Sequence, residues 1–114
     1  MKNTIIIKKN YEFKTLFSKG KFYYGEFIHM YIRKANSENN KFGIAISKKQ
    51  GKAVKRNYFK RLIRESYKNS ENKIKEGFNI LIVGNKNQNI EKISYYNVLE
   101  NLEKLLKKAG IFNE

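Results

Sequence analysis

The segment between residues 48 and 68 constrains the fold of this chain more than any other feature of its sequence. At the helical spacing of about 100° per residue, one side of the segment is apolar and the other is strongly basic. The apolar side is formed by Val54, Tyr58, Phe59, Leu62 and Ile63. Because an amphipathic helix gains most of its stability by packing its apolar side, we expect a long helix, over about residues 52–69, packed on a small β-sheet.

The basic side of this predicted helix repeats a cation every four residues, at Arg56, Lys60, Arg64 and Lys68. Like charges at this spacing cost a few tenths of a kcal/mol per pair, and Glu65 is the only acid in the segment. A solvated helix normally mixes the two signs, so the repeat indicates a polyanionic partner whose phosphates neutralise it. The expected contact residues, on the helix and the loop before it, are Lys48, Lys49, Lys52, Lys55, Arg56, Asn57, Lys60, Arg61, Arg64 and Lys68.

The overall charge agrees with a polyanionic partner. Lysine and arginine total 25 against 10 acids, a net charge of +15 in 114 residues. Nucleic acid is favoured over a membrane, because no long helix pairs a basic side with a continuous lipid-seeking side. The apolar run at residues 5–7 is too short for a signal peptide and the chain has no cysteine, so we expect a cytoplasmic protein. A lysine-rich composition that serves only solubility is the alternative.

The remaining elements predict a single α+β domain over residues 1–114. A short helix is expected from Asn10 to about Gly20, one or two strands over residues 22–33, and a strand over residues 42–47. After the basic helix come a strand over residues 78–83, buried on both faces, and a helix that begins after Ser94 and ends near Gly110. The expected architecture is a two-layer sandwich of a small mixed sheet and about three helices, in the order α-β-β-β-α-β-α.

The sequence offers no catalytic centre of its own. His29 is the only histidine and lies within a predicted strand, where histidine is usually structural. Without cysteine, neither a cysteine–histidine dyad nor a thiolate zinc site can form. Glu65, Glu71 and Glu76 are not spaced like the carboxylates of a two-metal site. We therefore expect no catalytic residue and no metal ligand in this chain.

Residues 42–65 resemble the signature of the bacterial ribonuclease P protein. That family has a strand ending in Ser-Lys-Lys, a turn with glycine, and then Ala-Val-x-Arg-Asn-Arg-x-Lys-Arg-x-x-Arg-Glu. Here the strand ends at Ser47, the turn contains Gly51, and the second motif begins at Ala53. The chain departs from the motif at Tyr58, which replaces an arginine and which the helical wheel places toward the apolar side.

The resemblance implies a protein subunit that binds a large catalytic RNA, which removes the 5′ leader of precursor tRNA by Mg²⁺-dependent hydrolysis. It implies that the basic helix contacts this RNA, that no DNA is bound, and that the fold contains a left-handed βαβ crossover, where general rules favour a right-handed one. It also implies a cleft for the single-stranded leader between the first helix and the sheet. The matching residues are Phe13 and Phe17, with Met30 or Tyr31.

Alternatives remain at the level of the residues alone. Phe13 and Phe17, four residues apart, are more often core residues than a platform for bases. A ribosomal or other structured-RNA protein that only stabilises its partner would have the same composition. A nuclease that acts without RNA is disfavoured by the lack of a cluster of acids and histidine.

Overall fold

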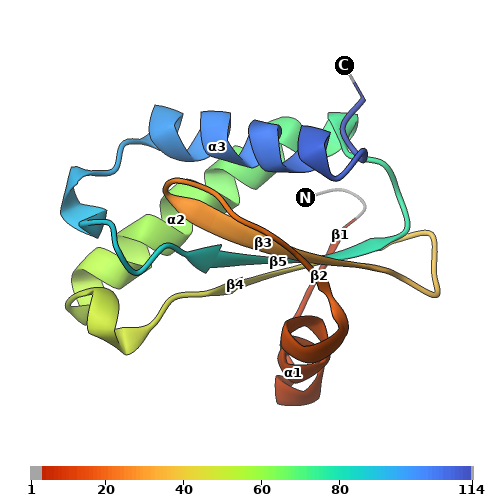
Figure 1. Cartoon of the computed structure of the whole chain (residues 1–114), viewed down its shortest axis with the longest axis horizontal. Coiled ribbons are helices and arrows are strands. Elements are labelled where there is room, and N and C mark those ends of the chain that lie inside the picture. Colours follow the sequence, from red (N-terminus) through yellow and green to blue (C-terminus); the bar gives the residue numbers. More distant parts are fainter. Residues whose placement is uncertain (1–3, 114) are drawn as a thin grey trace.

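The computed structural model describes residues 4–113, which form one five-stranded mixed sheet and three α-helices (Figure 1). The strand order is β1-β4-β5-β3-β2. The strands are β1 (Thr4–Ile6), β2 (Lys21–Tyr23), β3 (Ile28–Lys34), β4 (Asn40–Ala45) and β5 (Phe78–Gly84). The helices are α1 (Asn10–Lys19), α2 (Ala53–Ser70) and α3 (Tyr95–Lys108). Short 3₁₀ turns lie at Lys48–Gln50, Glu71–Lys73 and Ile90–Lys92.

The centre of the sheet is a pair of parallel strands. β4 pairs with β5 in parallel, and α2 is the helix that connects them. β3 pairs with the other side of β5 in antiparallel fashion, from Ile28 opposite Gly84 to Lys34 opposite Phe78. β5 is therefore flanked by strands on both sides. Ile80 and Ile82 pack in one apolar cluster and Leu81 in another, so both faces of β5 are buried, as its uninterrupted apolar sequence predicted.

Helices α2 and α3 cover one face of the sheet (Figure 1). Side chains that alternate along β3 and β5 point to this face, where they meet apolar residues of both helices. Burying a side chain of this kind contributes about 1.5–3 kcal/mol relative to leaving it exposed. The residues with no exposed surface in this core are Ile28, Met30, Phe59, Ile63, Tyr67, Ile80, Ile82, Val98, Leu102 and Leu106.

Helix α1 packs on the opposite face, where Leu16 joins Ile7 and Leu81 in a second, smaller cluster. The α+β class and the small mixed sheet are confirmed, but the two-layer arrangement was wrong, because α1 lies across the sheet from α2 and α3 (Figure 1). The predicted order of elements also lacked β1. This strand pairs in parallel with β4, from Thr4 opposite Asn40 to Ile6 opposite Phe42. β1 has only three residues and pairs with a strand far away in the chain, so the sequence contains no local pattern that would predict it.

Buried amides fix the loop between β2 and β3. The side-chain oxygen of Asn101, on α3, accepts hydrogen bonds from the backbone N–H groups of Phe27 at 2.7 Å and Ile28 at 3.0 Å. The side chain of Asn85 donates to the carbonyl oxygens of Gly25 and Glu26, at 3.2 and 2.8 Å. Buried backbone groups need such partners, so these two side chains hold the loop against the rest of the fold.

Candidate nucleic-acid interface

The first turn of α2 and the loop before it are held by local hydrogen bonds. Ser47 caps the short turn that follows β4, where its side-chain oxygen accepts from the N–H of Lys49 at 3.2 Å. Gly51 has φ of 149° and ψ of −176°, a conformation that side chains strongly disfavour. Arg56 Nε donates to the carbonyl oxygen of Gly51 at 3.1 Å, which anchors the guanidinium near the start of the helix.

The cations of α2 form a row along its exposed side. We call Arg56, Lys60, Arg64 and Lys68 the cationic row of α2; Arg56 and Lys60 are half-buried, and Arg64 and Lys68 are exposed. Among residues 4–113, Lys68 is the one member of the row with a carboxylate oxygen within 4.0 Å, that of Glu65 at 3.8 Å. Both partners are exposed, and such pairs contribute little. The other predicted contact residues, all exposed, are Lys48, Lys49, Lys52, Lys55, Asn57 and Arg61.

The predicted apolar side of α2 was partly wrong. Val54 is 76% exposed and Tyr58 is 56% exposed. The predicted Phe59, Leu62 and Ile63 are buried, and the buried side continues with Ser66, Tyr67 and Ser70. Tyr58 precedes Phe59 by one residue, so it points about 100° away from the side chain that packs on the sheet. The position that is arginine in the family motif is therefore an exposed tyrosine here and not part of the core.

Helix α1 carries the two phenylalanines of the predicted cleft at different depths. Phe13 is half-buried and lies over Gly43 of β4, where an added Cβ would come within 3.1 Å of the Phe13 ring. Phe17 is 45% exposed, and its ring centroid lies 5.0 Å from that of Tyr31 at an interplanar angle of 70°. If the two phenylalanines only packed in the core, both rings would be buried, and neither ring is fully buried here.

The structure separates the two strand residues predicted for the cleft. Met30 has no exposed surface and points into the core beneath α2 and α3, so placing it beside α1 was wrong. Tyr31, the next residue of β3, packs with the α1 cluster on the opposite face. Adjacent residues of a strand point to opposite faces, so only one of the two can lie beside Phe13 and Phe17.

A pocket of about 180 Å³ brings one aromatic residue of α1 together with two residues of the cationic row. It is lined by Phe13 of α1, by Lys60 and Arg64 of α2, and by β4 residues that include Gly43. β1 pairs only with residues 40–42 of β4, so the next residues of β4 have no strand beside them there. Residues that are far apart in the sequence therefore meet at one edge of the sheet. The sequence did not predict this junction.

Sequence reasoning also missed three aromatic residues beside Phe17 and Tyr31, of which Phe22 and Tyr24 are exposed and His29 is half-buried. Phe22, in β2, lies opposite Tyr31, with ring centroids 5.0 Å apart. His29 contacts Phe22 at 5.3 Å and Tyr24 at 4.8 Å. We call these five rings, in the order Phe17, Tyr31, Phe22, His29 and Tyr24, the aromatic strip. The run of three aromatics at residues 22–24 is the sequence signal for this strip, but such a run is equally typical of an ordinary strand.

His29 is held as a neutral ring in this strip. The backbone N–H of Gly25 donates to His29 Nδ1 at 3.0 Å, which requires an unprotonated Nδ1. Partial burial also lowers the pKa of His29 below its usual value. The histidine is therefore a structural and aromatic element near neutral pH.

Over residues 4–113, no three histidine, cysteine or acidic side chains gather where a metal ion could be held. No helix in the described part of the chain has the length and apolar character to cross a membrane. The fold and the exposed cations define a small basic α+β protein with a surface suited to a polyanion.

Comparisons with known proteins identify its family. The sequence model of the Ribonuclease P family matches residues 1–110. The ribonuclease P protein component of Clostridium botulinum (strain Loch Maree / Type A3) is 39% identical over 108 residues, covering 94% of this chain and 96% of the relative. That of Fusobacterium nucleatum is 36% identical over 107 residues, covering 92% and 96%.

Solved structures of ribonuclease P proteins have the same fold as this chain. The ribonuclease P protein of Staphylococcus aureus superposes with a TM-score of 0.83 at 30% identity, covering 95% of this chain and 97% of that one. The protein from Thermotoga maritima gives 0.83 at 29%, covering 91% and 96%. The chain belongs to the ribonuclease P protein family, as the motif at residues 42–65 predicted. It is thus a ribonucleoprotein component, with an RNA partner and a role in tRNA processing.

Proposed function

We propose that this chain binds the catalytic RNA of ribonuclease P and the 5′ leader of precursor tRNA, and so assists Mg²⁺-dependent endonucleolytic removal of the leader. The observation that carries the proposal is the pocket in which Phe13 of α1 meets Lys60 and Arg64 of α2. It joins a surface for phosphates to a surface for bases, as a single-stranded leader beside a structured RNA requires.

The contact with the catalytic RNA is assigned to the cationic row of α2 and the lysines around it. The arginines can each form two hydrogen bonds to phosphate oxygens, whereas Lys60 acts as a point charge. Asn57 is exposed beside the row and offers both a donor and an acceptor to a base edge or a ribose. Bound phosphates would attract the cations of the row and would also remove the repulsion between them. Both effects favour RNA binding.

The leader is assigned to the cleft beside α1, with Phe17 and Tyr31 as the aromatic residues that contact bases. Both rings can be reached from solvent, and stacking on them needs no particular base. Such tolerance suits leaders of different sequence. Phe13 is more buried and mainly shapes the floor of the cleft over Gly43.

The chemical step is assigned to the RNA subunit, with Mg²⁺ bound there and no catalytic residue in this chain. The protein would contribute positioning, and would offset the repulsion between two RNAs so that less Mg²⁺ is needed. This role places the protein in the cytoplasm, where tRNA precursors are made, with no membrane or DNA partner.

The test is cleavage of a precursor tRNA at low Mg²⁺ by this protein alone, by a bacterial ribonuclease P RNA alone, and by the two together. We expect strong cleavage at the correct 5′ end only in the mixture. Cleavage by the protein alone would contradict the assignment of catalysis to the RNA. Tight RNA binding without any gain in cleavage would favour a protein that only stabilises a structured RNA.

A further inference from the structure

The aromatic strip extends well beyond the two rings assigned to the leader cleft. From Phe17 on α1 it continues through Tyr31 and Phe22 to His29, and ends at Tyr24 in the loop after β2. Each step joins rings whose centroids lie between 4.8 and 5.3 Å apart. The strip therefore crosses from α1 over the two outermost strands on that side of the sheet.

The rings beyond Tyr31 are not there to fill the core. Phe22 is 47% exposed and Tyr24 is 63% exposed, and both lie outside the two buried clusters. Cross-strand contacts between Phe22, Tyr31 and His29 stabilise the β2–β3 pair, but one covered face of each ring would suffice for that. A contiguous aromatic surface of this kind, with three rings exposed and Tyr31 and His29 half-buried between them, is a candidate binding site.

The strip suits bases and not phosphates. None of its five members carries a charge near neutral pH, since His29 is neutral, so the rings offer flat apolar faces. The geometry of His29 is fixed by its hydrogen bond from Gly25, and the loop that bears Tyr24 is held by Asn85 and Asn101. A platform fixed in this way binds without first having to become ordered.

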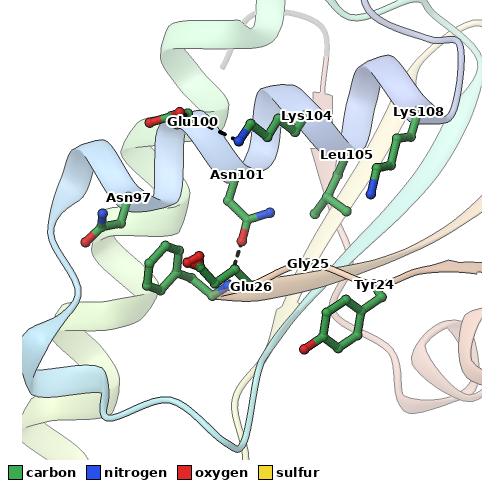
Figure 2. Close-up of a pocket in the computed structure, with 10 residues that line it drawn as sticks. Tyr24, Gly25, Glu26, Asn97, Glu100, Asn101, Lys104, Leu105 and Lys108 are labelled. Carbon is green, nitrogen blue, oxygen red and sulfur yellow. Dashed lines mark hydrogen bonds and ion pairs between the residues drawn. The ribbon is translucent and has the colours of Figure 1, made fainter.

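Cations lie at the far end of the strip. Tyr24 also lines an opening of about 460 Å³ between its loop and α3, where Lys104 and Lys108 are found (Figure 2). Figure 2 shows Lys108 reaching from α3 toward the loop, while Lys104 turns to Glu100, 3.8 Å away. Glu26 lies on the same rim. Lys108 is thus the better placed of the two lysines to meet a phosphate.

We propose that Phe22, His29 and Tyr24 form a second single-stranded RNA site, which stacks leader nucleotides farther from the cleavage point than those in the α1 cleft. The proposal rests on the proposed function, because it takes the leader to lie beside Phe17. The second site makes a separate prediction: the affinity for precursor tRNA increases with leader length until the strip is filled. The last nucleotides bound should then lie near Lys108, beyond Tyr24.

The experiment measures the affinity of the holoenzyme, reconstituted with a bacterial ribonuclease P RNA, for precursor tRNAs whose leaders are lengthened one nucleotide at a time. The variants are Phe22→Ala with Tyr24→Ala, and Phe22→Leu with Tyr24→Leu, which stays apolar but loses the ring faces. Tyr24→Phe should keep the wild-type behaviour. The matched control is Tyr96→Ala, which removes a ring that is 75% exposed on α3 and outside the strip.

We expect both double variants to match the wild type with the shortest leaders and to stop gaining affinity at a shorter length. With long leaders they should bind about five-fold or more weakly, because one stacked base contributes at least that much. Lys108→Gln should lower the salt slope for long leaders only, by about 0.7 log unit for one lost contact to a single strand.

Other outcomes would overturn the proposal. An unchanged dependence on length in the double variants would remove RNA from the strip. Equal losses at all lengths, together with a lower melting temperature, would show that the rings only stabilise the β2–β3 pair, or bind another partner. Phe17→Ala separates this test from the proposed function, because it should weaken binding of every leader. If Phe17→Ala has no effect on any precursor, the leader assignment itself fails.

Discussion

Neutralising three of the four residues in the cationic row of α2 should separate RNA binding from folding. The change is Arg56→Gln, Lys60→Gln and Arg64→Gln in one protein, which lowers the net charge from +15 to +12. Glutamine has nearly the helix propensity of lysine and arginine and keeps most of the side-chain length. The variant therefore loses three charges and little else.

The expected loss in RNA binding follows from counterion release. Each contact with a phosphate contributes about 0.7–0.9 to the slope of log affinity against log salt concentration, so three lost contacts lower that slope by about two to three. A charge that only raises the general attraction of the protein would change the slope far less. The slope is therefore the quantity that tells whether the row touches RNA.

The expected change in stability is small. Three like-charged pairs at i,i+4 spacing disappear, between Arg56 and Lys60 and onward to Lys68, which gains roughly 0.6–1.5 kcal/mol. The exposed hydrogen bond from Arg56 to the Gly51 carbonyl is also lost, at a cost of about 0.5–1 kcal/mol. These two effects nearly cancel, so the free energy of unfolding should change by less than about 1 kcal/mol.

The assay is equilibrium binding to a bacterial ribonuclease P RNA over a range of salt concentrations, with urea unfolding of each variant. The matched control changes three exposed lysines outside the row, Lys75, Lys86 and Lys92, to glutamine, with the same loss of charge. The control should keep the wild-type slope. If the two triple variants show the same slope, net charge and not the row governs binding. A large loss of stability in the row variant would show that the half-buried side chains of Arg56 and Lys60 pack against the fold and contribute to its stability.

Three further predictions concern single residues. Phe17→Ala should weaken binding of precursor tRNA more than binding of mature tRNA; equal losses with a lower melting temperature would instead indicate core packing. Asn101→Ala should lower the free energy of unfolding by about 1–3 kcal/mol, measured in urea, because two backbone N–H groups before and at the start of β3 lose their acceptor; an unchanged midpoint would mean that water replaces the amide fully. The folded protein should lose stability as the pH falls below about 6.5, because burial lowers the pKa of His29 and the unfolded chain then binds the proton first. His29→Gln should remove this dependence between pH about 7.5 and 5.5, since the chain has no other histidine, and a pH dependence identical to the wild type would contradict it.

Much of the fold was readable because its determinants are local. The period of apolar residues predicted α1, α2, α3 and the central strands, and Ser94 marked the start of α3, where the structure has a capping box with Asn97. The charge repeat of α2 predicted a row of cations along one side of the helix, which the structure has, with Arg64 and Lys68 exposed and Arg56 and Lys60 half-buried. Both signals lie within a few turns of one helix and depend on no distant partner.

The sequence did not predict which face of the sheet or helix each residue would occupy, or which distant residues would meet. The sequence offered Met30 and Tyr31 as equivalent neighbours in one strand, and only the packing of α2 and α3 decided which face became the main core. The exposure of Tyr58 follows from where the sheet meets the helix: the contact includes Phe59 and Ile63 but extends toward Tyr67, so Tyr58 lies beyond the edge of the buried side.

Composition and helical period by themselves determined a basic α+β protein, because charge and period are written in consecutive residues, and the resemblance of the motif at residues 42–65 added the family. The tertiary structure alone decided that α1 lies across the sheet from α2, that Phe13 meets Lys60 and Arg64 in one pocket, and that five rings line up from Phe17 to Tyr24. The reason is physical: these contacts join residues distant in the chain, and long-range pairing is fixed by the packing of the whole sheet and not by any local pattern.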